Sequence, residues 1–144
     1  MIFDSHKGKY FIRLDRGEEV LTSLYKIIKK ENINAGWING IGAVEKVEIV
    51  SYDLRIKKYI NIELDGVFEI TSLMGNIAYK DDDPFLHLHV NLSDHKGVCY
   101  GGHLNKAKIN ATGEFFINSY DKKVTRKYDD DIGLHLLRFH NDGK

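Results

Sequence analysis

Histidines are concentrated in one segment of the chain, residues 84–104, which reads PFLHLHVNLSDHKGVCYGGHL. The segment holds four of the seven histidines in the 144-residue chain and its single cysteine. Imidazole nitrogens bind zinc and related divalent ions, and a thiolate does the same. This segment is therefore the first candidate for a site that carries chemistry.

Strand periodicity separates these histidines from the apolar residues around them. Successive side chains of a strand point to opposite faces of the sheet. Between Leu86 and Leu92 the apolar residues hold the even positions, whereas His87, His89 and Asn91 hold the odd ones. Residues two apart on one face stand roughly 7 Å apart at their Cα atoms, so two imidazoles can reach one ion. The pattern predicts a strand with an apolar core face and a histidine face.

The third ligand depends on the turn that follows this strand. The letters DHKG favour a hairpin, and a three-residue loop that ends at Gly97 in the left-handed conformation pairs Asp94 with Val98. Counted back along both strands, His103 then faces His89, and three imidazoles share one face. A two-residue loop instead shifts the register by one and sends His103 to the opposite face. In the first register the other face of the second strand would join the core through Val98, Tyr100, Gly102 and Leu104.

Three neutral imidazoles with a fourth position open are typical of catalytic and regulatory zinc sites more than of closed structural ones. We therefore expect His87, His89 and His103 to bind a divalent metal ion, with zinc as the first choice. Gly101 lies on the same face and would leave room at the open position. Cys99 is a further candidate ligand, although two pairing steps separate it from His103. The competing interpretation is that the three histidines are half-buried and hydrogen-bonded, without a metal.

The remaining histidines lie in the turn or near the chain ends, and we expect them in solvent: His6, His95, His135 and His140.

The elements that must position the histidines are one helix and a set of strands. From Gly17 to about Glu31 apolar residues recur at steps of three and four, with glutamates at the start and lysines at the end. The segment before this helix alternates, and most of the chain after it is rich in β-branched and aromatic residues. Glycines 36, 40 and 42 predict bulges or close approaches, and residues 134–138 predict a final strand. The expected fold class is α+β, a mostly antiparallel β-sheet with one main α-helix packed on it.

The composition is that of one soluble globular domain over residues 1–144, with 42% hydrophobic and 29% charged residues. Lysine plus arginine equals aspartate plus glutamate at 21 each, which counts against nonspecific nucleic-acid binding. A single cysteine, no signal-peptide pattern and no long apolar run lead us to expect a cytoplasmic protein without a membrane span.

Four motifs in this order resemble the PPC domain, a family conserved in plants and prokaryotes: GWINGIGAVEKVEI, GVFEITSLMGNIA, HLHVNLSD and GGHL. The similarity runs from about Tyr10 to Phe139. It implies the α+β fold described above, a homotrimer, and a metal ion gathered by the histidines that match His87, His89 and His103.

The resemblance says less about activity. Plant members carry AT-hooks, which enter the DNA minor groove, and prokaryotic members are commonly described as DNA-binding by association. This chain has no such segment, because its only proline is Pro84 and no two arginines are neighbours. DNA is therefore a weakly supported partner.

Two kinds of function remain open. The first is a metal-containing trimeric binding module that assembles with itself or a partner. The second is a metal-dependent enzyme or small-ligand binder that uses the open position, where bound water reaches a pKa near 7. The charged residues to examine beside the metal are Arg13, Glu69 and Glu114, each of which is also explained as an ordinary surface charge. No catalytic residue is assigned, since the chain has no nucleophile elbow, P-loop or dinucleotide fingerprint.

Overall fold

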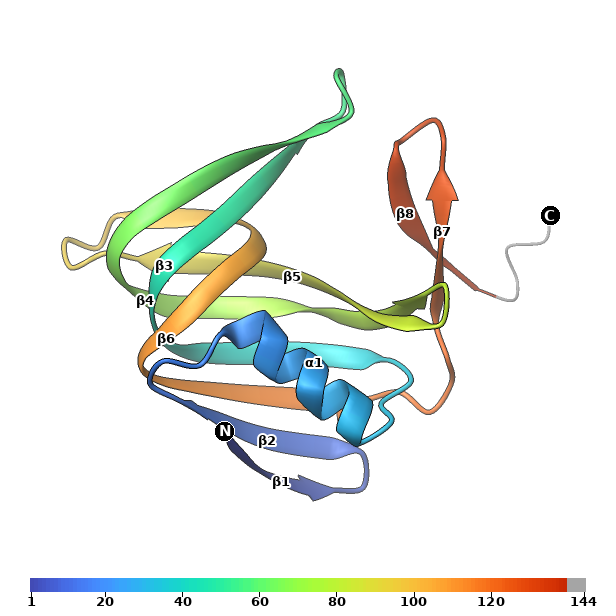
Figure 1. The fold of residues 1–144 in the computed structure, drawn as a ribbon, viewed down its shortest axis with the longest axis horizontal. Helices are drawn as coiled ribbons and strands as arrows, with labels where there is room; N and C mark the ends of the chain where they lie inside the picture. The colour runs from blue at the N-terminus through green and yellow to red at the C-terminus, as the bar shows by residue number, and fades with distance from the viewer. Residues whose placement is uncertain (140–144) are drawn as a thin grey trace.

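The computed structural model describes residues 1–139. Within them the chain forms one helix and eight strands, and the strands pair antiparallel except at one parallel bridge between β4 and β7 (Figure 1). This is the predicted α+β class. In chain order the elements are β1 (Ile2–His6), β2 (Lys9–Asp15), α1 (Val20–Lys30), β3 (Gly36–Asp53), β4 (Lys58–Lys80), β5 (Asp83–Ser93), β6 (Cys99–Ser119), β7 (Thr125–Asp129) and β8 (Leu134–Arg138).

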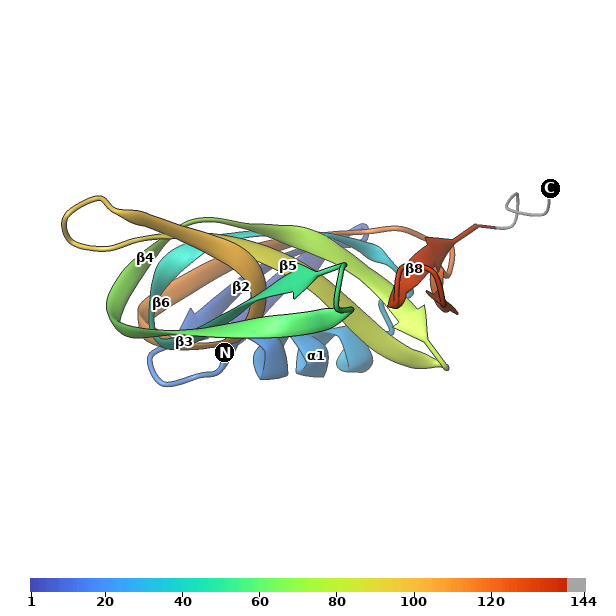
Figure 2. The ribbon, with the colours of Figure 1, turned by 90° about the horizontal axis from the view of Figure 1, so that it is seen from above.

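Four strands form a closed ring. β4 pairs with β3 and β5, and β6 pairs with β5 and β3, so each of the four has a partner on both sides. β3, β4 and β6 are 18, 23 and 21 residues long and bend so that their two halves belong to different parts of the ring (Figure 2). One bend lies at the predicted glycine bulge, where the register shifts between Gly40 and Gly42. Gly42 has φ +148°, and a Cβ there would lie 2.5 Å from the carbonyl oxygen of Thr112.

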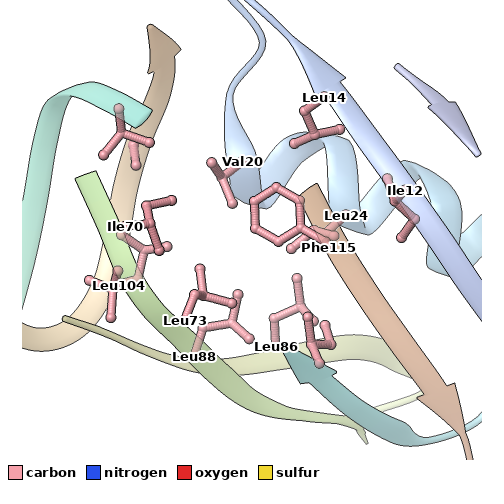
Figure 3. Packing of buried hydrophobic residues seen from close by; sticks show 14 of the residues in the cluster. Ile12, Leu14, Val20, Leu24, Ile70, Leu73, Leu86, Leu88, Leu104 and Phe115 are labelled. Carbon is pink, nitrogen blue, oxygen red and sulfur yellow. The ribbon is translucent and has the colours of Figure 1, made fainter. Parts of the chain in front are cut away.

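The apolar face of α1 packs on one side of the sheet. Val20, Leu24, Ile27 and Ile28 are fully buried, and they join a core to which β2, β4, β5 and β6 contribute (Figure 3). Burying each such side chain stabilises the fold by roughly 1.5–3 kcal/mol. The interior of the ring and the helix–sheet interface thus form one continuous core.

The helix begins at Val20, three residues after the predicted start at Gly17. Residues before it are committed to the sheet: the Gly17 N–H donates to the Ile109 carbonyl at 2.8 Å, and the Ile109 N–H donates to the Glu18 carbonyl at 2.8 Å. Glu19 then caps the helix, since its carboxylate accepts from the backbone N–H groups of residues 21 and 22. The glutamates that periodicity placed inside the first turn therefore precede the helix.

The β7–β8 hairpin stands apart from the ring (Figure 1) and includes the predicted final strand. One bridge, between Tyr79 and Thr125, joins it to β4. The Tyr52 hydroxyl donates to the Ile132 carbonyl at 2.7 Å, which ties the hairpin to the far end of β3. No helix in the described part of the chain is long and apolar enough to span a membrane.

Candidate metal centre

The strand that carries the first two histidines has the predicted parity. Leu86, Leu88, Val90 and Leu92 of β5 are all buried, whereas His87 is half-buried and His89 is exposed on the other face. A strand with apolar residues on one face and polar residues on the other turns its apolar face toward the core. β5 thus presents its histidines away from the core.

The turn after β5 is the predicted three-residue loop. The Asp94 N–H donates to the Val98 carbonyl and the Gly97 N–H to the Asp94 carbonyl, both at 3.0 Å. Gly97 has φ +78°, the left-handed conformation that the loop requires. In the resulting register His89 faces His103. The prediction that His103 joins the histidine face is confirmed.

The prediction for the opposite face of β6 is wrong in part. Leu104 is buried, but Val98 and Tyr100 are 49% and 36% exposed. β6 pairs with β3 only from His103 onward, so the tip of the β5–β6 hairpin projects beyond the ring and no second layer covers it (Figure 1).

The three imidazoles converge. Nε2 of His87 lies 3.2 Å from Nε2 of His89, and one ring nitrogen from each of His87, His89 and His103 lies within 4.8 Å of the others. Two nitrogens bound to one tetrahedral zinc ion at about 2.0–2.1 Å are roughly 3.3 Å apart. The closest pair already has this spacing, and the third nitrogen lies within 4.8 Å of both. The residues present therefore fit a single divalent ion.

The electrostatics favour neutral imidazoles. Burial, the Arg126 guanidinium and the two neighbouring imidazoles lower the pKa of His87 to about 4. Burial, His89 and Arg126 also lower the pKa of His103. At pH 7 both rings are uncharged, so each has a free lone pair, which is the form that binds a metal.

Arg126 of β7 is the functional residue that the sequence did not indicate. Its Nη2 donates to Oδ1 of Asn76 at 2.9 Å and lies 3.4 Å from Nδ1 of His87. Its Nη1 donates to the His135 carbonyl at 2.8 Å, and the guanidinium lies over the Phe85 ring at 5.0 Å. Burial lowers the pKa of Arg126, but a guanidinium still remains charged at neutral pH.

Two pockets open beside the histidines. One, of about 300 Å³, is lined by all three histidines together with Gly101. The other, of about 490 Å³, lies between the ring and the β7–β8 hairpin. Its walls are Val50, Tyr59, Phe85, His87, His103, Asn105, Arg126, Tyr128, Gly133, Leu134, His135 and Leu136.

The charged residues proposed for the metal's surroundings lie elsewhere. Arg13 faces Glu114 across β2 and β6, at the opposite end of β6 from the histidine, and its guanidinium pairs with Asp15 at 3.1 Å. Glu69 faces Ser93 at the far end of β5. None of Arg13, Glu69 and Glu114 lines either pocket beside the histidines.

Cys99 also lies outside the cluster. It faces Ser93 near the tip of the hairpin and is exposed, so it does not belong to the group of converging ligand atoms.

The other histidines follow the prediction with one exception. His6 and His95 are exposed, and His140 lies outside the described residues. His135, expected in solvent, is half-buried, lines the larger pocket and packs its ring 5.2 Å from that of Tyr128. The register of the β7–β8 hairpin brings it there, because His135 faces Tyr128.

Comparison with known proteins gave one family and several related structures. The family model of the Plants and Prokaryotes Conserved (PCC) domain matches residues 1–121. A plant- and prokaryote-conserved protein from Pyrococcus horikoshii is 35% identical, with a TM-score of 0.85 and 96% of this chain and 95% of that chain covered. A comparison with curated proteins gave no match.

Two further structures bear on function through their names. A protein from Bacteroides thetaiotaomicron, provisionally named a DNA-binding protein, is 29% identical, with a TM-score of 0.93 and 96% of both chains covered. A metal-containing protein from Archaeoglobus fulgidus is 34% identical, with a TM-score of 0.85 and 96% of this chain and 99% of that chain covered.

Proposed function

The chain belongs to the Plants and Prokaryotes Conserved domain family, and from this premise we propose that it is a metal-binding module that assembles with copies of itself. The observation that carries the proposal is the convergence of His87, His89 and His103. Three neutral nitrogen ligands suit zinc best among common divalent ions, and they leave its fourth position to water or a ligand. The metal-containing relative from Archaeoglobus fulgidus supports the same assignment.

Elemental analysis of the purified protein tests metal binding. We expect about one zinc per chain in the wild type and none in the double variant His87→Ala, His89→Ala, since a lone imidazole does not retain the ion. His95→Ala is the matched control, because this histidine lies exposed in the turn of the same hairpin. Metal retained at wild-type stoichiometry in the double variant would exclude this site.

Self-assembly is supported by the sheet face opposite the helix. Phe11 faces Phe116 across β2 and β6, their rings lie 4.9 Å apart, and Phe11 is 71% exposed. The same row continues across β3 to Met74 of β4, which is 45% exposed. Asn39 of β3 separates Met74 from the two phenylalanines in this row. Exposed apolar side chains gathered on one face mark interaction surfaces, and we propose that this face packs against neighbouring copies in a homotrimer.

Light scattering coupled to size exclusion tests the assembly. The wild type should elute with three times the mass of the chain, and Phe11→Ser with Met74→Ser should shift it to smaller species. Leu54→Ser is the control, because Leu54 is 52% exposed but lies at the tip of the β3–β4 hairpin. A monomeric wild type, or an unchanged mass in the double variant, would contradict the proposal.

DNA is the least supported partner. The argument for DNA binding is the provisional name of the Bacteroides relative. Against it, the chain has no net charge and no segment of the kind that enters the minor groove. A mobility shift with an A·T-rich duplex at about 0.15 M salt is the test. We expect no retardation by the metal-loaded protein.

A second candidate function is that of a small-ligand binder or metal-dependent enzyme. The observation that favours it is the pocket of about 490 Å³ that adjoins His87 and His103. The chemistry that an ion at these residues supplies is Lewis-acid polarisation of a ligand oxygen. The same three histidines would serve in the assembly module and in the ligand binder or enzyme. Identifying what the pocket binds would distinguish these two functions.

A further inference from the structure

We propose that the pocket between the ring and the β7–β8 hairpin binds a small organic acid, whose carboxylate lies between the metal centre and Arg126. The inference rests on the proposed metal binding and adds the class of ligand to it. Three properties of the pocket carry it: its charge, its hydrogen-bond donors and its apolar wall.

The charge of the pocket is positive and uncompensated. Arg126 is half-buried, and no aspartate or glutamate is among the described residues that line the pocket. Nor does Arg126 take part in an ion pair within residues 1–139. Neutral imidazoles cannot offset the charge of a divalent ion. Burying a cation without a counter-charge is unfavourable, so an anion from solution is the natural complement.

The donors of Arg126 are incompletely used. Its Nε is buried without a hydrogen-bond partner among the described residues. Nη2 approaches Nδ1 of His87, but a metal bound to Nε2 of that ring places the ring proton on Nδ1. Nδ1 then donates and can no longer accept from Arg126. Metal binding therefore leaves one N–H of the guanidinium without an acceptor at the edge of the pocket. A carboxylate oxygen of a ligand can accept a hydrogen bond from this N–H.

Apart from Asn105 and His135, the remaining wall is apolar and aromatic. A volume of about 490 Å³ falls within the range of small-molecule sites. The planar guanidinium of Arg126 suits the two oxygens of a carboxylate, and no further lysine or arginine lines the described part of the pocket to pair with a second acidic group of the ligand. The ligand class is thus a monocarboxylic acid with an aromatic or branched apolar group. That group would contact Val50, Tyr59, Phe85, Tyr128, Leu134 and Leu136.

Calorimetric titration of the zinc-loaded full chain with mandelate and with mandelamide tests the proposal. The two probes share the phenyl and hydroxyl groups and differ in the carboxylate. We expect mandelate to bind at least about tenfold more tightly, because a charge-assisted hydrogen bond contributes roughly 10- to 100-fold in affinity. Arg126→Gln should reduce this preference, because only the metal then distinguishes the two probes, while zinc content stays at the wild-type value.

Two further variants separate charge from structure. Arg126→Lys keeps the cation and should keep most of the preference for mandelate. Lys127→Gln removes an exposed cation from the other face of β7 and should change nothing. Because zinc content is measured on every sample, a wild type without zinc refutes the metal site itself. A zinc-loaded wild type that binds neither probe or does not distinguish them, or an Arg126→Lys variant that loses the preference as fully as Arg126→Gln, overturns the carboxylate site alone.

Discussion

The position of His87 depends on a glycine in the neighbouring strand. Gly75 of β4 faces Leu88 of β5 and is buried. A Cβ at this position would overlap the His87 carbonyl oxygen and would lie 2.8 Å from both the His87 carbonyl carbon and the Leu88 Cα. Ordinary contacts between carbon atoms lie at about 3.5–4.0 Å, so Gly75→Ala must push β5 away by on the order of 1 Å.

The expected effects follow from this displacement. Overpacking of this kind costs about 1–3 kcal/mol in the free energy of unfolding, which for a chain of this size lowers Tm by roughly 3–9 °C. Metal sites tolerate errors of about 0.2 Å in ligand position, so zinc affinity should fall by about tenfold or more. Gly36→Ala is the matched control, since a Cβ there would lie 2.7 Å from the Asn118 carbonyl oxygen and Gly36 lines neither pocket beside the histidines.

Competition for zinc with a chromophoric chelator gives the affinity, and thermal denaturation in EDTA gives the stability of the metal-free fold. The reasoning is refuted if Gly75→Ala binds zinc as tightly as Gly36→Ala. It is refuted equally if both variants melt at the wild-type temperature, because the spacing of β4 and β5 would then not position His87.

Three further predictions concern the turn, the ligand set and pH. Gly97→Ala should cost about 1 kcal/mol in urea unfolding from backbone strain alone, because no atom lies within 4 Å of the added Cβ; a Gly97→Asn variant equally destabilised would contradict this. Cys99→Ser should leave zinc content unchanged, and lost metal would make the thiol a ligand. The pKa of His87 is lowered to about 4, so the unfolded chain binds more protons than the folded one between about pH 6.5 and 4. The metal-free wild type should therefore be fully stable above that window and lose stability as pH falls through it, more steeply than His87→Gln; parallel urea-unfolding profiles would exclude His87 as the cause.

The cluster of three histidines could be predicted from sequence because it depends on local rules. Parity separates His87 and His89 from the leucines between them, and the loop that ends at Gly97 fixes the partner of His89 as His103. These rules act over about twenty residues and need no knowledge of the rest of the fold. The same rules could not predict that Tyr100 is exposed, because its exposure depends on where β3 stops pairing with β6.

The pocket could not be predicted in the same way. Arg126 lies in a lysine-rich stretch that reads as a solvated strand, and His135 lies near the chain end. Both reach the site only because the β7–β8 hairpin folds beside β5, which one bridge and a few side-chain hydrogen bonds determine. Arg13, Glu69 and Glu114 do not lie beside the histidines, although they belong to strands of the same sheet. Their positions along these strands are far from those of the histidines.

One bridge and a few side-chain hydrogen bonds attach the β7–β8 hairpin to the ring, and this has a consequence for how such a domain diversifies. The three histidines lie on strands that the ring holds at both edges, whereas Arg126 and much of the pocket wall lie on a hairpin that begins after the family match ends at residue 121. The pairing that brings His89 opposite His103 does not involve residues 125–138. Replacing this hairpin with one of different charge would therefore change the charge of the pocket and leave the histidine register intact.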